Sequence, residues 1–269
     1  MAEKTEIEKT EHRIRKSFWN LQEEFGLIEP GDKVMACLSG GKDSYTMLDM
    51  LLHAQKALQN SFEIIAVNLD QKQPGFPEEV LPKYLTEKGV NFRIIEKDTY
   101  SIVMEKLSKG KTMCTICSRL RRGILYDVAS EIGATKVALG HHREDVLETF
   151  FLNLFFAGKI EAMPAKYKTD DGRHVVIRPL AYAKEKDIEV FAKHMEYPII
   201  PCNLCGSQEG MQRAAMKKML ADWEEKYPNR SEIMLTALKN IHPSHLFDKK
   251  RYDFDTYTHL EKVMEEMKP

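Results

Sequence analysis

Residues 33–44 read KVMACLSGGKDS, and this stretch decides the fold. Residues 33–38 form a short apolar run bounded by turn residues, which predicts a buried strand. The pair Gly40-Gly41 predicts a sharp turn, because glycine accepts backbone conformations that other residues avoid. Apolar residues at helical spacing then follow over residues 43–58. The stretch is therefore predicted to be a strand, a tight loop and a helix.

The same alternation continues along the chain. It predicts an α/β fold: a doubly wound parallel sheet with helices on both faces, which binds ligands beyond the carboxyl ends of its strands. Further strands are predicted at residues 62–69, 91–95, 136–139 and 174–177, and helices at 78–88, 100–107, 118–132, 144–156, 184–195 and 209–240. We expect an N-terminal helical segment at 1–30, an α/β domain at 31–197 and a C-terminal helical extension at 198–269.

The composition is that of a folded, nearly neutral protein. The 269 residues include 40 basic and 41 acidic side chains, giving a net charge of −1, and 43% are hydrophobic. This excludes a disordered chain and a uniformly basic nucleic-acid coat. No run of 18 apolar residues occurs, and the charged N-terminus lacks the apolar core of a secretory signal. We therefore expect a cytoplasmic protein with no membrane segment.

The loop after the first strand is predicted to bind phosphate. The N–H groups that open the following helix, with the positive end of its dipole, attract an anion, and serine hydroxyls and a lysine ammonium add donors. The spacing is not that of the Walker sequence, which places four residues before its Gly-Lys. The alternative is a plain strand-to-helix turn with serine and aspartate as caps. The candidate residues are Ser39, Gly40, Gly41, Lys42, Asp43 and Ser44.

A second polar stretch, residues 139–145 (LGHHRED), follows the fourth strand. Because parallel strands end at one edge of the sheet, it is expected beside the first loop. Gly140 and His141 are candidate nucleotide contacts, and Asp145 is a candidate Mg²⁺ ligand together with Asp43. The alternative is that Asp145 caps the helix that starts here and that the histidines are ordinary core or surface residues.

Four of the five cysteines form two C-x-x-C pairs, Cys114 with Cys117 and Cys202 with Cys205, and 84 residues lie between the pairs. This spacing fits a zinc site, an iron–sulfur cluster or redox thiols, and does not decide among them. An odd cysteine count without an export signal argues against a disulfide framework. Cys37, inside the first strand, is expected to be a buried apolar residue.

Basic residues surround the first cysteine pair. Residues 106–122 carry six basic side chains and no acid, which predicts a local positive surface for RNA phosphates. Basic residues at 178, 184, 186, 213, 217 and 218 are candidates to extend it. The alternative is a solvated helix face. The candidate RNA-binding residues are Lys109, Lys111, Arg119, Arg121 and Arg122.

These motifs together resemble a known family. Residues 39–44 (SGGKDS) resemble the PP-loop of ATP pyrophosphatase-type enzymes, which cleave ATP between the α- and β-phosphates and adenylate a carbonyl oxygen. Three longer stretches resemble the TtcA family of tRNA-cytidine(32) 2-sulfurtransferases, over about 85% of the chain. They are residues 114–126 (CTICSRLRRGILY), 140–149 (GHHREDVLET) and 200–208 (IPCNLCGSQ).

The resemblance implies three cofactors: ATP, Mg²⁺ and an oxygen-sensitive [4Fe–4S] cluster. By motif position, Cys114, Cys117 and Cys202 hold the cluster and Cys205 is a non-ligand close to it, so that one iron stays open for the transferred sulfur. The adenine pocket is implied at residues 67–69, at the end of the second strand, with Asp70 just beyond.

The implied reaction is thiolation of a tRNA anticodon-loop cytidine at its C2 position. The C2 oxygen attacks the α-phosphate of ATP, and sulfur then displaces AMP. Lys42 and Asp43 are the implied catalytic residues of the ATP step. Cysteine is the implied sulfur source, through a cysteine desulfurase partner, and a homodimer is the implied assembly. The alternatives are another PP-loop enzyme, a uridine thiolase or an amide-forming ligase, and a zinc-stapled RNA-binding module.

Overall fold

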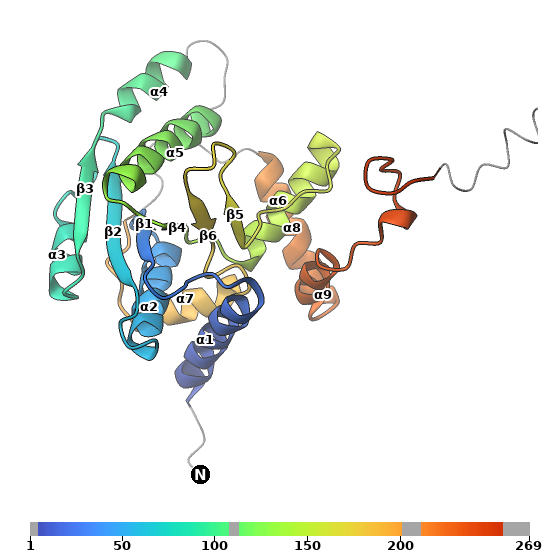
Figure 1. The fold of residues 1–269 in the computed structure, drawn as a ribbon, viewed down its shortest axis with the longest axis horizontal. Helices are drawn as coiled ribbons and strands as arrows, with labels where there is room; N and C mark the ends of the chain where they lie inside the picture. The colour runs from blue at the N-terminus through green and yellow to red at the C-terminus, as the bar shows by residue number, and fades with distance from the viewer. Residues whose placement is uncertain (1–4, 108–112, 201–210, 255–269) are drawn as a thin grey trace, which may run out of the picture.

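A six-stranded sheet forms the centre of the computed structural model, which describes residues 5–107, 113–200 and 211–254 (Figure 1). The strand order is β3-β2-β1-β4-β6-β5, and every neighbouring pair is parallel except β5 with β6. The predicted parallel sheet is confirmed. The strands are β1 (Lys33–Leu38), β2 (Glu63–Asp70), β3 (Phe92–Glu96), β4 (Lys136–Ala138), β5 (Lys166–Lys168) and β6 (Val175–Ile177).

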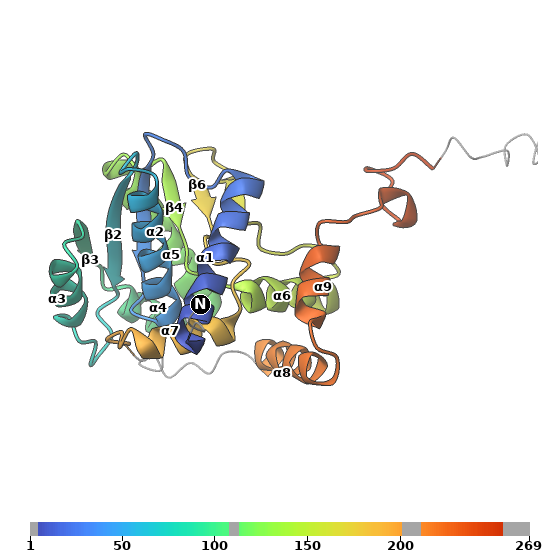
Figure 2. The same cartoon turned by 90° about the horizontal axis from the view of Figure 1, so that it is seen from below.

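Helices cover both faces of this sheet, as Figures 1 and 2 show. One layer contains α1, α2 and α7, and the other contains α5. The helices α6, α8 and α9 gather at one end of the molecule. The bounds are α1 (Glu6–Phe25), α2 (Lys42–Ala57), α3 (Val80–Glu87), α4 (Thr99–Leu107), α5 (Met113–Glu131), α6 (Arg143–Leu152), a π-helical turn η1 (Asn153–Ala157), α7 (Glu185–His194), α8 (Met211–Lys226), α9 (Arg230–Ala237) and a 3₁₀ turn η3 (Pro243–His245).

Strand alternation decides which residues reach which layer. Val34 and Ala36 of β1 lie in the core beneath α1, α2 and α7, whereas Met35 packs with Val128 in the core beneath α5. Successive side chains of a strand point to opposite faces, so a continuous apolar run fills both cores. This explains why apolar and polar residues do not alternate along the buried strands.

The structure differs from the sequence predictions at three places. The strand β5 was not predicted, because its three residues, Lys-Tyr-Lys, form no apolar run; it pairs antiparallel with β6 at the edge of the sheet. The helix predicted at 209–240 is two helices, since Pro228 cannot continue the hydrogen-bond ladder and Asn229 is left-handed, with a φ of 68°. The helix at 144–156 becomes a π-helical turn from residue 153 onward.

The N-terminal helix belongs to the main core. Thr5 and Glu8 form a capping box at its start, and its buried residues Ile14, Phe18 and Leu21 pack in the same cluster as β1. The predicted N-terminal helix is therefore present and packs on the sheet, whereas the division into three segments stays a prediction. None of the described helices has the length and apolarity needed to span a membrane.

Candidate active site

The phosphate loop joins β1 to α2 in the predicted way. Gly40 has a φ of 81°, which favours glycine, and Gly41 is the N-cap of α2 without a side-chain hydrogen bond. Ser39 and Ser44 contact each other through their hydroxyl oxygens, 3.4 Å apart, and Ser44 donates to the carbonyl of Gly41 at 2.8 Å. The N-cap Gly41 has no side chain to cap the first turn of α2, so the N–H groups of Lys42 and Asp43 are available to an anion, whereas that of Ser44 donates to the carbonyl of Gly41.

The segment before the second cysteine pair lies on this loop. The N–H of Ile200 donates to the carbonyl of Gly40 at 2.9 Å, and a β-carbon on Gly40 would lie 2.8 Å from Cδ1 of Ile200. The hydroxyl of Tyr45 in α2 donates to the carbonyl of Pro198 at 3.0 Å. The chain therefore runs along the loop before it reaches Cys202.

The loop after β4 approaches the phosphate loop closely. A β-carbon on Gly140 would lie 3.1 Å from the backbone of both Asp43 and Ser44. Because these are backbone atoms, a β-carbon here would push the two loops apart by a few tenths of an ångström, so glycine favours their close approach. The predicted proximity of the two stretches is thus observed.

A pocket of about 180 Å³ opens between the two loops. This volume is below the roughly 300–1,000 Å³ of complete small-molecule sites, so the described walls enclose part of a nucleotide. Asp70 is not among the lining residues: its carboxylate accepts from the N–H of Lys72 at 2.7 Å and pairs with the Lys72 ammonium at 3.1 Å. The lining residues include Ser39, Asp43, Ser44, Gly140 and His141 of the loops, Val67 and Leu69 of β2, Cys37 of β1 and Arg121 of α5.

The two histidines after β4 have different electrostatics. Burial and the charge of Arg178 lower the pKa of His141 to about 4, so His141 is neutral at pH 7. Burial opposes protonation of His142 as well, but its pair with Glu144 at 3.3 Å and the charges of Asp145 and Asp43 outweigh burial and raise its pKa. Nδ1 of His141 accepts from Arg178 at 3.3 Å, so the neutral ring carries its proton on Nε2 and is suited to donate one hydrogen bond in the pocket.

Charged groups form a network beside the loop. Lys42 donates to Asp43 at 3.0 Å and to Glu185 of α7 at 3.2 Å. Asp145 accepts from the N–H of His142 at 3.1 Å, so its expected capping role is present, and its other oxygen accepts from Arg213 at 2.7 Å. Sequence analysis did not single out Glu185; the only signal was its place in the first turn of a helix.

The structure places some of the five cysteines but not others. Cys114 and Cys117 lie one turn apart on the backbone of α5, and Cys202 and Cys205 lie outside the described residues. Cys37, expected to be buried, is only partly buried and lines the pocket; desolvation raises the pKa of its thiol to about 12. Among the side chains that the structure describes, which do not include those of Cys114 and Cys117, no three His, Cys, Asp or Glu residues are arranged to hold a metal ion.

The predicted basic surface separates into inward and outward residues. Lys109 and Lys111 lie outside the described residues, Arg119 and Arg122 are exposed, and Arg121 lines the pocket. Arg178, Arg213 and Lys217, considered as extensions of this surface, instead donate to other protein groups.

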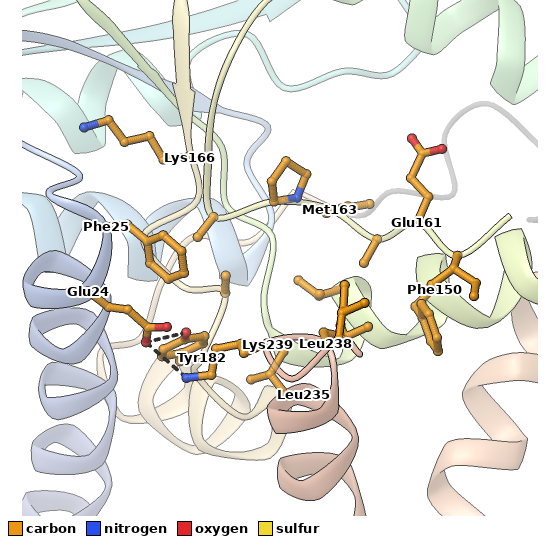
Figure 3. Close-up of a pocket in the computed structure, with 17 residues that line it drawn as sticks. Glu24, Phe25, Phe150, Glu161, Met163, Lys166, Tyr182, Leu235, Leu238 and Lys239 are labelled. Carbon is orange, nitrogen blue, oxygen red and sulfur yellow. Dashed lines mark hydrogen bonds and ion pairs between the residues drawn. The ribbon is translucent and has the colours of Figure 1, made fainter. Parts of the chain in front are cut away.

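A second, larger pocket of about 460 Å³ lies elsewhere in the molecule (Figure 3). It is apolar, its walls come from α1, α6 and α9, and none of the loop residues line it.

The strand, glycine loop and helix, with a recess between the loops at the carboxyl edge of a parallel sheet, define the PP-loop class of ATP-binding proteins. The PP-loop domain model matches residues 9–200. In fold, the chain is similar to the U34-tRNA thiolase NcsA from Methanococcus maripaludis, solved with its [4Fe–4S] cluster, with a TM-score of 0.69 and 21% identity over 87% of this chain and 81% of that one.

Relatives in sequence are closer. The tRNA-cytidine(32) 2-sulfurtransferase of Cytophaga hutchinsonii is 69% identical over 95% of this chain and 89% of its own length. The enzymes of that name from Azotobacter vinelandii (63% identical over 91% of this chain and 90% of theirs) and Yersinia enterocolitica (57%, over 98% and 84%) are also similar. The chain belongs to the tRNA-cytidine(32) 2-sulfurtransferase family.

Proposed function

We propose that this chain uses ATP and an iron–sulfur cluster to convert the cytidine at position 32 of tRNA to 2-thiocytidine. The name shared by its relatives supports the base and the reaction. The PP-loop domain supports the use of ATP.

The hydrogen bond between Ile200 and Gly40 carries the proposal. It holds the chain on the phosphate loop two residues before Cys202. Across the pocket, Arg121 lines the wall, and Cys117 lies one helical turn earlier in α5. Each cysteine pair is thus only a few residues along the chain from a residue at the nucleotide site. Transfer of sulfur to an ATP-activated base requires the sulfur and the base to be held close together.

In the first step, the C2 oxygen of cytidine attacks the α-phosphate of ATP, and pyrophosphate leaves. The loop N–H groups and Lys42 stabilise the developing negative charge. Asp43 and Asp145 are the proposed Mg²⁺ ligands, with oxygen donors that suit this ion. His141 is neutral and lines the same pocket, so it can hydrogen-bond the reacting phosphate or base.

In the second step, sulfur bonds to C2 and AMP leaves with the original oxygen. Thiolates are the donors that an iron–sulfur cluster requires, and we assign Cys114, Cys117 and Cys202 to this role. When bound, the [4Fe–4S] cluster supplies an open iron at which the sulfur is held. The sulfur comes ultimately from cysteine through a desulfurase, and a thiol or electron-carrier reductant supplies the two electrons that bring the persulfide sulfur to the sulfide level before it bonds to C2.

Recognition of tRNA, assembly and location complete the proposal. Arg119 and Arg122 are exposed beside the first cysteine pair, as phosphate contacts must be. A homodimer and a cytoplasmic location are the proposed assembly and site of action.

Nucleoside mass spectrometry of tRNA from a strain lacking this gene tests the function. We expect loss of 2-thiocytidine with 2-thiouridine derivatives intact. Loss of a 2-thiouridine with 2-thiocytidine intact would identify a uridine thiolase instead. A colourless, zinc-containing protein after anaerobic purification would favour the zinc-stapled RNA-binding module.

A further inference from the structure

Helix α8 directs two cations toward the phosphate loop. Arg213 donates to Asp145 at 2.7 Å and to Glu148 at 2.9 Å, and Lys217 donates to Glu185 at 2.9 Å. Residues four apart lie on one face of a helix, so this face of α8 is turned toward the site. The Arg213 contacts attach α8 to α6, against which it packs.

Lys217 and Lys42 share one oxygen atom. The ammonium of Lys42 lies 3.2 Å from Oε1 of Glu185, and that of Lys217 lies 2.9 Å from the same oxygen. Two ammonium groups this close repel each other unless an anion lies between them. The Lys42 ammonium also lies 3.0 Å from Asp43 in the first turn of α2, so this anionic oxygen shares a cation with the N-terminus at which phosphate is expected.

We propose that Lys217 is a phosphate-binding residue of the active site, which together with Lys42 binds the β- and γ-phosphates of ATP and the pyrophosphate that leaves. The proposal rests on the proposed use of ATP and adds α8 as a second wall of that site. Glu185 holds the place of a phosphate oxygen when no nucleotide is bound. Arg213 is a positioning residue, which keeps α8 on α6 so that Lys217 reaches the loop.

The neighbouring residue Lys218 shows that this orientation is specific. It lies on the same helix but donates to Asp222 at 2.6 Å, one turn further along α8. Its side chain is 75% exposed, against 58% for Lys217. Lys218 is therefore a matched control with the same charge and the same helix, but with Asp222 rather than Glu185 as its partner.

The test is titration calorimetry on the full chain purified anaerobically with its cluster. The ligands are Mg·ATP, Mg·pyrophosphate and AMP, and the variants are Lys217→Gln and Lys218→Gln. We expect Lys217→Gln to weaken Mg·ATP and Mg·pyrophosphate about tenfold, as for loss of one charge-assisted hydrogen bond, with AMP unchanged. Lys218→Gln should bind all three as the wild type does.

A third variant, Glu185→Gln, is expected to strengthen binding rather than weaken it. Glu185→Gln removes the charge that competes for Lys42 and Lys217, so metal-free pyrophosphate should bind several-fold more tightly. A destabilised fold would not produce tighter binding, so this result cannot come from a structural defect.

Three results would overturn the inference alone: unchanged Mg·ATP affinity in Lys217→Gln, an equal loss of AMP affinity, or a loss of tRNA affinity with Mg·ATP unchanged. The last would make Lys217 an RNA contact. A wild-type chain that binds no Mg·ATP would overturn the proposed function and this inference with it.

Discussion

The backbone N–H of Ile200 donates to the carbonyl of Gly40 at 2.9 Å, and the Ile200 side chain fills the space that a β-carbon on Gly40 would need. Two features therefore disfavour any residue other than glycine at position 40: the backbone φ of 81° and the contact with Ile200. Through it, the phosphate loop and the segment leading to the second cysteine pair hold each other in place.

Gly40→Ala should therefore weaken Mg·ATP binding by about tenfold or more. The left-handed backbone alone costs about 1–2 kcal/mol of stability, and the contact with Ile200 adds to it. Gly75→Ala is the control, since Gly75 has a φ of 79° and nothing within 4 Å of an added β-carbon. Calorimetry with Mg·ATP and urea unfolding measure both effects. Equal behaviour of the two variants would show that the Ile200 contact is unimportant.

Glu144 should contribute to stability in a pH-dependent way. Burial acts to raise its pKa, but His142 and Arg143 outweigh burial and lower it to about 2 from the ordinary 4.5. A lowered folded pKa means that the charged carboxylate stabilises the fold above about pH 4.5, and that this contribution is lost as pH falls toward 2.

Glu144→Gln should then cost on the order of 3 kcal/mol at pH 7 and flatten the acid limb of the stability curve. Urea unfolding between pH 7 and pH 3 measures this. The matched control is Glu63→Gln, on an exposed carboxylate 3.7 Å from Lys33, with an expected change within about 0.5 kcal/mol. An acid limb as steep as in the wild type would contradict the prediction.

The cysteines should divide into ligands and non-ligands. Cys114→Ser, Cys117→Ser and Cys202→Ser should each lose iron, acid-labile sulfide and thiolation activity, because a serine oxygen is a poor substitute for thiolate. Cys37→Ser should keep the cluster, since burial raises the pKa of that thiol to about 12 and keeps it protonated. Iron and sulfide analysis of anaerobic protein tests this set. Loss of the cluster in Cys205→Ser would refute the assignment of Cys202 as the third ligand.

Arg121 and Arg122 should have different roles although they are adjacent. Arg122 is exposed, so Arg122→Gln should weaken tRNA binding, lower its salt slope by about one and leave Mg·ATP affinity unchanged. Arg121 lines the pocket, so Arg121→Gln should weaken Mg·ATP binding as well. Filter binding of tRNA over a salt series, with calorimetry for Mg·ATP, separates the two. If neither variant changed tRNA affinity, the predicted RNA surface would be wrong.

The sheet could be predicted where local pattern carries the information. The strands β1 and β2 are apolar runs between turn residues, and their alternate side chains fill two cores. The edge strand β5 (Lys-Tyr-Lys) was not predicted, because a strand that pairs with one neighbour at the edge of a sheet needs no apolar run. Pro228 was visible in the sequence, but only the structure showed that it separates two helices.

The sequence by itself determined the strand–glycine loop–helix unit and, through the parallel sheet, the meeting of the loops that contain Asp43 and Gly140. These follow from backbone rules that act over a few residues and from the shared carboxyl edge of parallel strands. Only the tertiary structure decided that Ile200 and Glu185 reach the loop and that Lys217 reaches Glu185. Those contacts join segments far apart in the chain, and they depend on how helices pack, which no local pattern encodes.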